Sequence, residues 1–380
     1  MYLRSQIFKD SGEESFFLWG ARQTGKSTLL GNLYKNHLYI DLLLSDIFER
    51  YHRNPELLRE VVMAWDGPQP VIIDEIQRIP SLLHEVQWLM VNTGAKFILS
   101  GSSPRKILKS GTNLLGGRAL RYELYPLIKK EIPDFDLLRA LNHGLLPRHY
   151  LSERPQKLLS AYIGSYLQDE IIAEAKIRNI GSFTRFLEIA AFSNGEMVNY
   201  SNIASDCGVS PPTVREYFQI LEDTLLGRFV PSFQKKPKRR IIQSPRFYYF
   251  DVGIANYLLK RGNILAGSET FGKAFEHYIY HEIYAHRQYS QSAYPISYWR
   301  TTSGLEVDFI LGDHEVAVEV KATPNASARH LKGLKSFADE YTVKRKILVS
   351  LDPVPRKSGD ILILPWSRFL ELLWNGEIIT

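Results

Sequence analysis

At 380 residues, with 44% hydrophobic and 23% charged residues, the chain has room for two or three globular domains and is neither disordered nor fibrous. The net charge of +6 is modest and does not by itself indicate a nucleic-acid partner. One cysteine excludes an intramolecular disulfide framework, and no run approaches the ~20 apolar residues of a membrane span, so we expect a cytoplasmic protein without a membrane partner.

The first predicted element is a strand, Phe16–Trp19, that leads into a phosphate-binding loop. The loop, GARQTGKS, satisfies G-x-x-x-x-G-K-[ST], and a helical pattern follows it. In such loops backbone amides and a helix N-terminus surround the phosphates of ATP. Lys26 would reach the β- and γ-phosphates, and Ser27 would bind Mg²⁺. The predicted nucleotide-binding residues of the loop are Gly20, Ala21, Arg22, Gln23, Thr24, Gly25, Lys26, Ser27 and Thr28.

Two later apolar strands, VIIDE and KFILS, end in polar residues. At the end of the first, Asp74 is predicted to hold Mg²⁺ through water and Glu75 to polarise the attacking water. After the second, Ser102 is the predicted sensor of the γ-phosphate, with Ser103 as the next candidate. Because strands alternate with helices, we expect a parallel sheet that binds its ligand at the strand C-termini, in an α/β ATPase core spanning residues 1–125.

An arginine, Arg118, follows two glycines in the sequence LLGGR. A rigid guanidinium stabilises the charge that develops on a transferred phosphoryl group, so Arg118 is a candidate to complete the site of a neighbouring subunit in a homo-oligomer. The residues alone do not decide between this role and an ordinary surface arginine.

The middle of the chain is predicted to be helical, first as a lid or linker (126–190) and then as a winged helix (191–262). A short helix over Ser201–Cys207, a Gly-Val turn and a second amphipathic helix that begins after Ser210 form a helix–turn–helix pattern. Two predicted strands, 227–233 and 247–251, follow it. The sequence KKPKRR lies between these strands, at the place of a wing.

No acidic residue occurs between Asp223 and Asp251, whereas this segment contains seven lysines and arginines. Such a block is either a solvated loop or a surface for phosphates. It favours contact of the winged helix with nucleic acid, DNA in particular, over packing against the ATPase or a partner protein. The predicted DNA-contacting residues are Thr213, Arg215, Lys235, Lys236, Lys238, Arg239 and Arg240.

The last predicted domain, residues 263–380, contains a charged hairpin with the strands LEVDF and VAVEVK. Strand alternation brings Asp308, Glu319 and Lys321 to one patch, which Glu276 can reach from an upstream helix. Carboxylates suit Mg²⁺ or Mn²⁺, and a lysine can stabilise charge at a scissile phosphate. We therefore predict the metal ligands Glu276, Asp308 and Glu319 and the catalytic residue Lys321. The alternative is a surface hairpin with a weak Glu–Lys pair.

With these motifs in order, the chain resembles a bacterial and archaeal family of AAA-type (AAA+) ATPases. In this family a P-loop ATPase domain is joined to a winged helix and a C-terminal restriction-endonuclease-like PD-(D/E)xK domain. The resemblance runs nearly end to end, through GARQTGKST, VIIDEIQRIPSLL, FILSGSS and LLGGRAL, and then GVSPPTVREYFQILEDTLL, FYYFDVGIANYL, FGKAFEHYI and EVDFIL…VAVEVKA. One departure is the serine after Lys26, where threonine is more usual.

The resemblance implies ATP with Mg²⁺, subunit assembly with Arg118 acting in trans, and a nuclease-type metal site at Glu276, Asp308, Glu319 and Lys321. The leading hypothesis is an ATP-controlled, metal-dependent DNA nuclease. The alternative is a non-cleaving ATPase switch that binds DNA or a protein through its winged helix.

Overall fold

The computed structural model describes residues 2–8, 13–109, 115–164, 177, 179–235, 242–260 and 262–379. The chain divides into two compact units. The N-terminal unit comprises the residues up to 127 together with 146–148 and 219–226, and the C-terminal unit comprises the remainder. Four of the predicted DNA-contacting residues, Lys236, Lys238, Arg239 and Arg240, lie outside the described residues.

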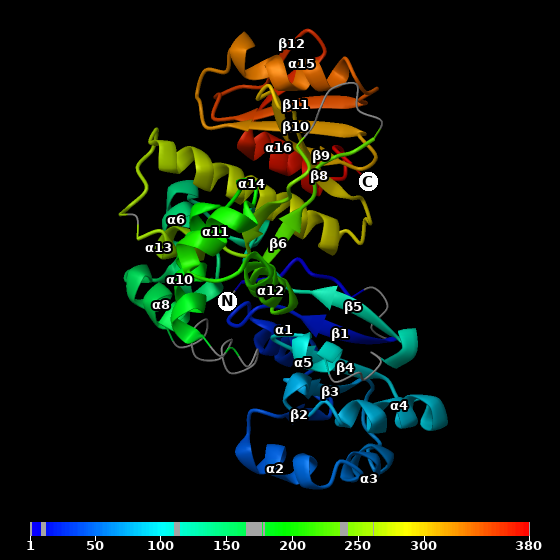
Figure 1. Ribbon diagram of the computed structural model, residues 1–380. Helices are drawn as coiled ribbons and strands as arrows, with labels where there is room; N and C mark the ends of the chain where they lie inside the picture. Colours follow the sequence, from blue (N-terminus) through cyan, green and yellow to red (C-terminus); the bar gives the residue numbers. More distant parts are fainter. Residues whose placement is uncertain are drawn as a thin grey trace. The chain divides into compact units, whose positions relative to one another are not determined.

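A five-stranded parallel sheet forms the centre of the N-terminal unit (Figure 1). Its strands are β1 (Ser15–Trp19), β2 (Tyr39–Asp41), β3 (Val71–Asp74), β4 (Phe97–Gly101) and β5 (Ala119–Glu123), in the order β2-β3-β4-β1-β5. Every residue of β1, β3 and β4 is buried, as expected where both faces of a parallel sheet are covered. The predicted parallel sheet is therefore confirmed.

Helices and short 3-10 turns connect these strands. They are α1 (Lys26–Leu33), α2 (Ser45–Arg53), α3 (Leu57–Met63), η1 (Ile76–Arg78), α4 (Leu82–Thr93), α5 (Arg105–Lys109) and η2 (Leu115–Gly117). Side chains from α3, α4 and α5 pack with Phe17, Ile73 and Leu99 of the strands in one hydrophobic core.

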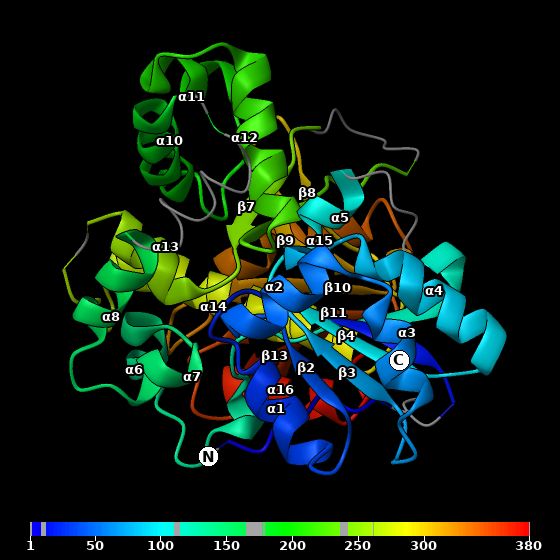
Figure 2. The ribbon, with the colours of Figure 1, turned by 90° about the horizontal axis from the view of Figure 1, so that it is seen from below.

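Within residues 126–262, the described part of the chain is largely helical. The described helices are η3 (Lys129–Glu131), α6 (Leu137–His143), α7 (Pro147–Leu151), α8 (Pro155–Ala161), α10 (Ile180–Phe192), α11 (Tyr200–Cys207), α12 (Pro211–Asp223) and α13 (Val252–Leu258). Figure 2 shows α10, α11 and α12 gathered together, and the ring of Phe218 in α12 packs 4.9 Å from that of Phe186 in α10. The strands β6 (Gly227–Val230) and β7 (Arg246–Tyr249) pair antiparallel. The second strand begins one residue earlier than predicted and includes Arg246.

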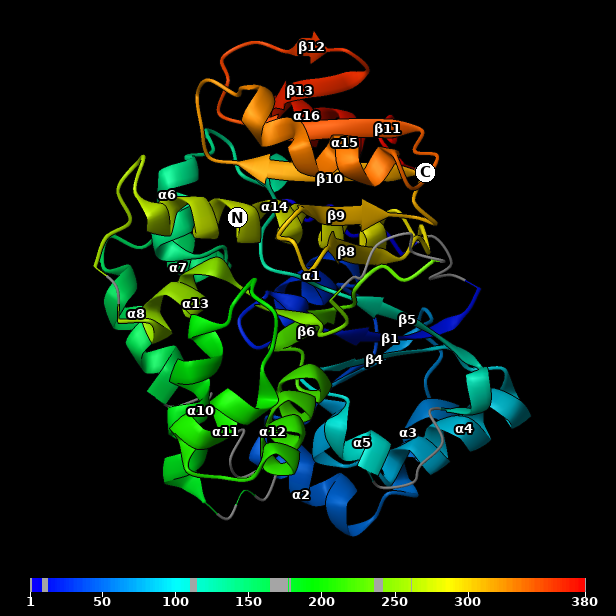
Figure 3. The same ribbon diagram turned by 45° about the horizontal axis from the view of Figure 1, so that its top comes forward.

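A six-stranded mixed sheet forms the rest of the C-terminal unit. Its strands are β8 (Ile296–Arg300), β9 (Glu306–Leu311), β10 (Val316–Lys321), β11 (Arg345–Ser350), β12 (Arg356–Ser358) and β13 (Ile361–Pro365), in the order β12-β13-β11-β10-β9-β8. Figure 3 shows α15 (Lys332–Ala338), which follows η5 (Ala328–Leu331), on one face of this sheet. The helices α14 (Glu269–Tyr289) and α16 (Trp366–Trp374) lie on the other face.

The sequence predicts no membrane-spanning segment, and the described helices bear on this prediction. Within the described ranges, no helix is both long enough and apolar enough to span a bilayer.

Candidate functional site

The predicted phosphate-binding loop lies between the end of β1 and the start of α1. Lys26 is buried, and its Nζ donates to the carbonyl oxygens of Gly20 (2.7 Å) and Ala21 (3.3 Å). Two glycines are required here for different reasons. Gly25 has a φ of 96°, and a Cβ on Gly20 would lie 2.5 Å from the carbonyl oxygen of Leu124. The remaining predicted residues fall in the same turn and the first turn of α1, namely Arg22, Gln23, Thr24, Ser27 and Thr28.

Ser27 and Asp74, the two predicted Mg²⁺-binding residues, are brought into contact. The Ser27 hydroxyl donates to Asp74 Oδ2 over 2.6 Å. Tyr39 on β2 donates to the same oxygen over 2.7 Å, and the Glu75 amide donates to Oδ1 over 3.0 Å. A hydroxyl beside a carboxylate is a donor set of hard oxygens that fits Mg²⁺. Burial lowers the pKa of Lys26, although Glu75 and Asp74 oppose this shift.

Glu75 and Ser102 meet through a residue that the sequence analysis did not select, Gln77. The Gln77 amide donates to Glu75 Oε2 and to Ser102 Oγ (3.0 Å), and the Ser102 hydroxyl lies 3.4 Å from Glu75 Oε2. Gln77 Oε1 is buried and forms no hydrogen bond with the described residues. A Cβ on Gly101 would lie 2.3 Å from this oxygen, so glycine makes room for the amide.

Ser103 and Arg118 lie apart from these contacts. The Ser103 hydroxyl donates to the carbonyl oxygen of Asp223 over 3.4 Å, so Ser103 packs toward the end of α12. Arg118 follows η2, and its side chain is exposed whereas Leu115 in the same turn is buried. The contacts of Ser102 and Ser103 thus favour Ser102 as the residue near Glu75, and Arg118 is exposed.

In the C-terminal unit the structure brings the predicted hairpin residues together. Val318 of β10 lies opposite Phe309 of β9, so Glu319 and Asp308 are neighbours. Lys321 Nζ lies 2.6 Å from Glu319 Oε1 and 3.7 Å from Asp308 Oδ2. Asp308 and Glu319 are only 2% and 3% exposed. The alternative of a surface hairpin is therefore wrong.

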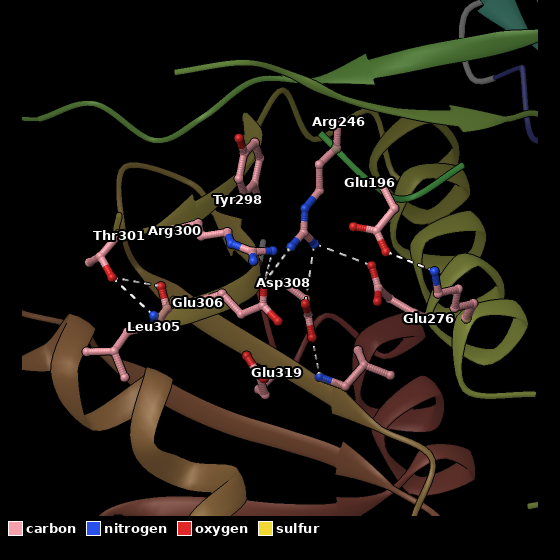
Figure 4. Close-up of polar contacts among 12 residues, drawn as sticks. Glu196, Arg246, Glu276, Tyr298, Arg300, Thr301, Leu305, Glu306, Asp308 and Glu319 are labelled. Carbon is pink, nitrogen blue, oxygen red and sulfur yellow. Dashed lines mark hydrogen bonds and ion pairs between the residues drawn. The ribbon is translucent and has the colours of Figure 1, made fainter. Parts of the chain in front are cut away.

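A buried arginine, Arg246 of β7, occupies the middle of this patch (Figure 4). One of its terminal nitrogens lies 3.3 Å from Asp308 Oδ1 and 3.4 Å from Glu276 Oε1, and the other lies 3.1 Å from Glu306 Oε2. Tyr248, two residues along the strand, donates to Glu276 Oε1 over 2.6 Å. We call Glu276, Glu306, Asp308 and Glu319 the acid cluster.

The cations and the burial of the acid cluster act in opposite directions on its pKa values. Burial raises the pKa of Glu276 to about 7, and Asp308 adds to the rise. Burial followed by Asp308 raises the pKa of Glu319 well above its ordinary value. For Asp308, burial acts to raise the pKa, but Lys321, Arg246 and the hydrogen bond from the Val320 amide together hold it below its usual range. Asp308 is thus the carboxylate that the two cations keep ionised.

As arranged, the acid cluster does not fit a divalent metal ion. Among the described residues, no group of three or more His, Cys, Asp or Glu side chains is placed to hold a metal. The predicted ligands Glu276 and Asp308 instead face Arg246, and Glu319 faces Lys321. Glu319 Oε2 is buried without a hydrogen bond to any described residue, but one such oxygen is too few for Mg²⁺ or Mn²⁺.

The three predicted DNA-contacting residues that are described differ in their surroundings. Arg215 is exposed on α12, with its guanidinium 4.5 Å from the Tyr200 ring centre. Thr213 is half-buried, and its hydroxyl lies 2.9 Å from that of Ser210. Lys235 forms an ion pair with Asp313. Arg215 and Lys235 are thus both exposed, whereas Thr213 is not fully so.

Three family matches cover most of the chain. Residues 13–132 match an AAA domain, residues 134–264 match a domain of unknown function (DUF8612), and residues 271–369 match another domain of unknown function (DUF4143). The first match covers the sheet, the loop and the residues around Asp74 and Glu75. The N-terminal part of the chain is thus similar to AAA domains.

Two distant similarities extend over most of the chain. The chain is 24% identical over 321 residues to the uncharacterized protein Rv2008c of Mycobacterium tuberculosis, covering 82% of this chain and 70% of that protein. It is 23% identical over 434 aligned positions to the uncharacterized protein MJ1637 of Methanocaldococcus jannaschii, covering 97% and 87%. The sequence similarity to these two proteins therefore extends beyond the AAA domain.

Proposed function

We propose, from the AAA domain at residues 13–132, that the protein binds ATP with Mg²⁺ and hydrolyses it. One observation carries the proposal: the Ser27 hydroxyl and the Asp74 carboxylate meet at 2.6 Å beside the buried ammonium of Lys26. In the proposed site the loop amides bind the phosphates, and Ser27 and Asp74 hold Mg²⁺, directly or through water. The bound ion would neutralise charge on the phosphates.

Within this proposal Glu75 is the residue that polarises the attacking water. Its carboxylate is held by Gln77, which also contacts Ser102, the proposed γ-phosphate sensor. Gln77 thereby connects the sensor to the base and acts as a positioning residue. Its Oε1, which has no hydrogen-bond partner among the described residues, is a further acceptor for the water that Glu75 would orient.

A thermal shift tests nucleotide binding. At an ATP concentration of 100 Kd with Mg²⁺, binding stabilises the folded state by about 2.7 kcal/mol, which raises the melting temperature of the N-terminal unit by roughly 9 °C. We expect this shift in the wild type and in Lys35→Ala, an exposed lysine after α1. We expect no shift in Lys26→Ala. An equal shift in Lys26→Ala would contradict the assignment of the loop.

We further propose that the protein assembles as a homo-oligomer in which Arg118 completes the ATP site of a neighbouring subunit. The exposure of Arg118, after a turn with two glycines of positive φ, supports this role. A guanidinium that enters from another chain makes hydrolysis depend on assembly.

For the C-terminal unit we propose a winged helix followed by a restriction-endonuclease-like domain that acts on DNA. The contiguous α11, α12 and β6–β7 hairpin, with the exposed Arg215, support DNA binding. The convergence of Asp308, Glu319 and Lys321 favours cleavage as a second candidate function. Lys321 would stabilise charge at the scissile phosphate.

Plasmid DNA tests both parts of this proposal. We expect mobility-shift binding that weakens with salt, as phosphate contacts require, and that is reduced in Arg215→Ala. Nicking with ATP and Mg²⁺ or Mn²⁺ that is lost in Lys321→Ala and retained in Lys335→Ala, an exposed lysine of α15, would support cleavage at this site. Binding without nicking under every condition would favour the non-cleaving switch, and nicking by Lys321→Ala would exclude this site as its source.

A further inference from the structure

The position of Arg246 is fixed by its backbone as well as by its side chain. On one side Arg246 pairs with Val230 of β6, and on the other it forms an antiparallel bridge with Met197. Its guanidinium lies 4.6 Å from the centre of the Tyr298 ring, and the whole residue is 3% exposed. Arg246 is therefore a buried, structurally fixed member of the site around the acid cluster and not a surface arginine.

The guanidinium lies between two of the three predicted metal ligands, Glu276 and Asp308. A single nitrogen lies 3.3 Å from Asp308 Oδ1 and 3.4 Å from Glu276 Oε1, so it separates the two predicted ligand oxygens. The other oxygen of Asp308 accepts the Val320 amide at 2.9 Å. Mg²⁺ needs such oxygens at about 2.1 Å in octahedral geometry, which the intervening nitrogen prevents.

Charge balance explains why the arginine is stable there. Buried carboxylates require compensating cations, and a planar guanidinium serves several carboxylates at once. Lys321 pairs with Glu319, and Arg300 pairs with Glu306 at 3.0 Å. Arg246 contacts Glu276 and Asp308 as well as Glu306. It supplies the positive charge that a divalent ion would otherwise supply to Glu276 and Asp308.

We propose that Arg246 is the resident cation of the acid cluster and keeps divalent metal ions out of it. Removal of the guanidinium, and not the supply of metal, then decides whether Glu276 and Asp308 become metal ligands. This inference bears on the proposed cleavage function, but it is a statement about metal occupancy and holds whether or not the unit cuts DNA.

Mn²⁺ titration followed by electron paramagnetic resonance tests it directly, because the signal of free Mn²⁺ is lost on binding. The full chain is used without nucleotide and with Asp74→Asn, which removes the N-terminal site. We expect no Mn²⁺ bound at the acid cluster while Arg246 is present. We expect Arg246→Gln to bind one Mn²⁺ per chain, roughly 10- to 100-fold more tightly, and Asp308→Asn to abolish this gain. The matched control is Arg356→Gln, which breaks an ion pair with Asp352 outside the acid cluster and should gain nothing.

Either of two results overturns the inference. One is tight, Asp308-dependent binding while Arg246 is in place, a measurement that requires no change at Arg246. The other is an Arg246→Gln protein, folded by circular dichroism, that still binds no Mn²⁺. If that variant does not fold, Arg246→Lys replaces it. An ammonium lacks the two terminal nitrogens of the guanidinium, so this variant should bind Mn²⁺ with an affinity between those of the wild type and Arg246→Gln. Mn²⁺ binding gained without any nicking of DNA would leave the inference standing and contradict the cleavage proposal.

Discussion

Replacing Glu75 with glutamine is expected to lower kcat for ATP hydrolysis by roughly 10²- to 10⁴-fold, the range that loss of a general base produces. Glutamine has the shape of glutamate and can still accept the hydrogen bond from Gln77, but it cannot take a proton from water. ATP should therefore still bind and raise the melting temperature of Glu75→Gln as it does in the wild type. Phosphate release at saturating ATP measures the loss.

Two further variants serve as a control and a comparison for Glu75→Gln. Glu60→Gln changes an exposed glutamate of α3 and should leave kcat unchanged. Gln77→Ala removes the positioning contact but keeps the base, so it should lower kcat less than Glu75→Gln does, with ATP binding retained. If Glu75→Gln turns over ATP at the wild-type rate, Glu75 is not the base.

Replacing Arg118 with alanine is expected to lower kcat by roughly 10³- to 10⁵-fold, the scale on which an arginine supplied in trans accelerates phosphoryl transfer. The reason is that the transition state loses a guanidinium while the nucleotide keeps its own loop, Lys26 and Mg²⁺-binding residues. Arg53→Ala, another exposed arginine of the N-terminal unit, is the control and should be as active as the wild type.

Mixing inactive variants distinguishes the trans role from its alternatives. A Lys26→Ala subunit has no working site but keeps Arg118, whereas an Arg118→Ala subunit has a complete site but no arginine to donate. An equimolar mixture should therefore recover part of the lost phosphate release. Loss without recovery would mean that Arg118 acts within its own chain, and full activity of Arg118→Ala would make it an ordinary surface arginine.

The N-terminal fold could be predicted from the sequence because its signals are local. Short apolar runs predict the buried strands β1, β3 and β4, and the spacing of glycines, Lys26 and Ser27 predicts the loop. The alternation of charged residues in β9 and β10 likewise predicts that Asp308, Glu319 and Lys321 meet. In each case the residues that matter are close in sequence or joined by a hairpin.

Contacts between segments that are distant in the sequence could not be predicted, because no local pattern specifies them. Tyr39 reaches Asp74 because β2 lies beside β3, and nothing in either strand specifies that order. Arg246 lies 30 residues from Glu276 and 62 from Asp308, and in the sequence it is only one cation of a basic block that is either a solvated loop or a surface for phosphates. The sequence did hold one signal for these contacts: Arg246 and Tyr248 are two residues apart in one short strand and so lie on the same face. Which side chains they contact there depends on the tertiary fold.

The central claim is that ATP is hydrolysed at the loop that carries Lys26, and phosphate release tests it most directly. The purified protein is incubated with ATP and Mg²⁺ beside Lys26→Ala and Lys35→Ala. We predict phosphate release by the wild type and Lys35→Ala and only background release by Lys26→Ala. Equal release by all three proteins, or none by the wild type in its assembled form, would contradict the claim.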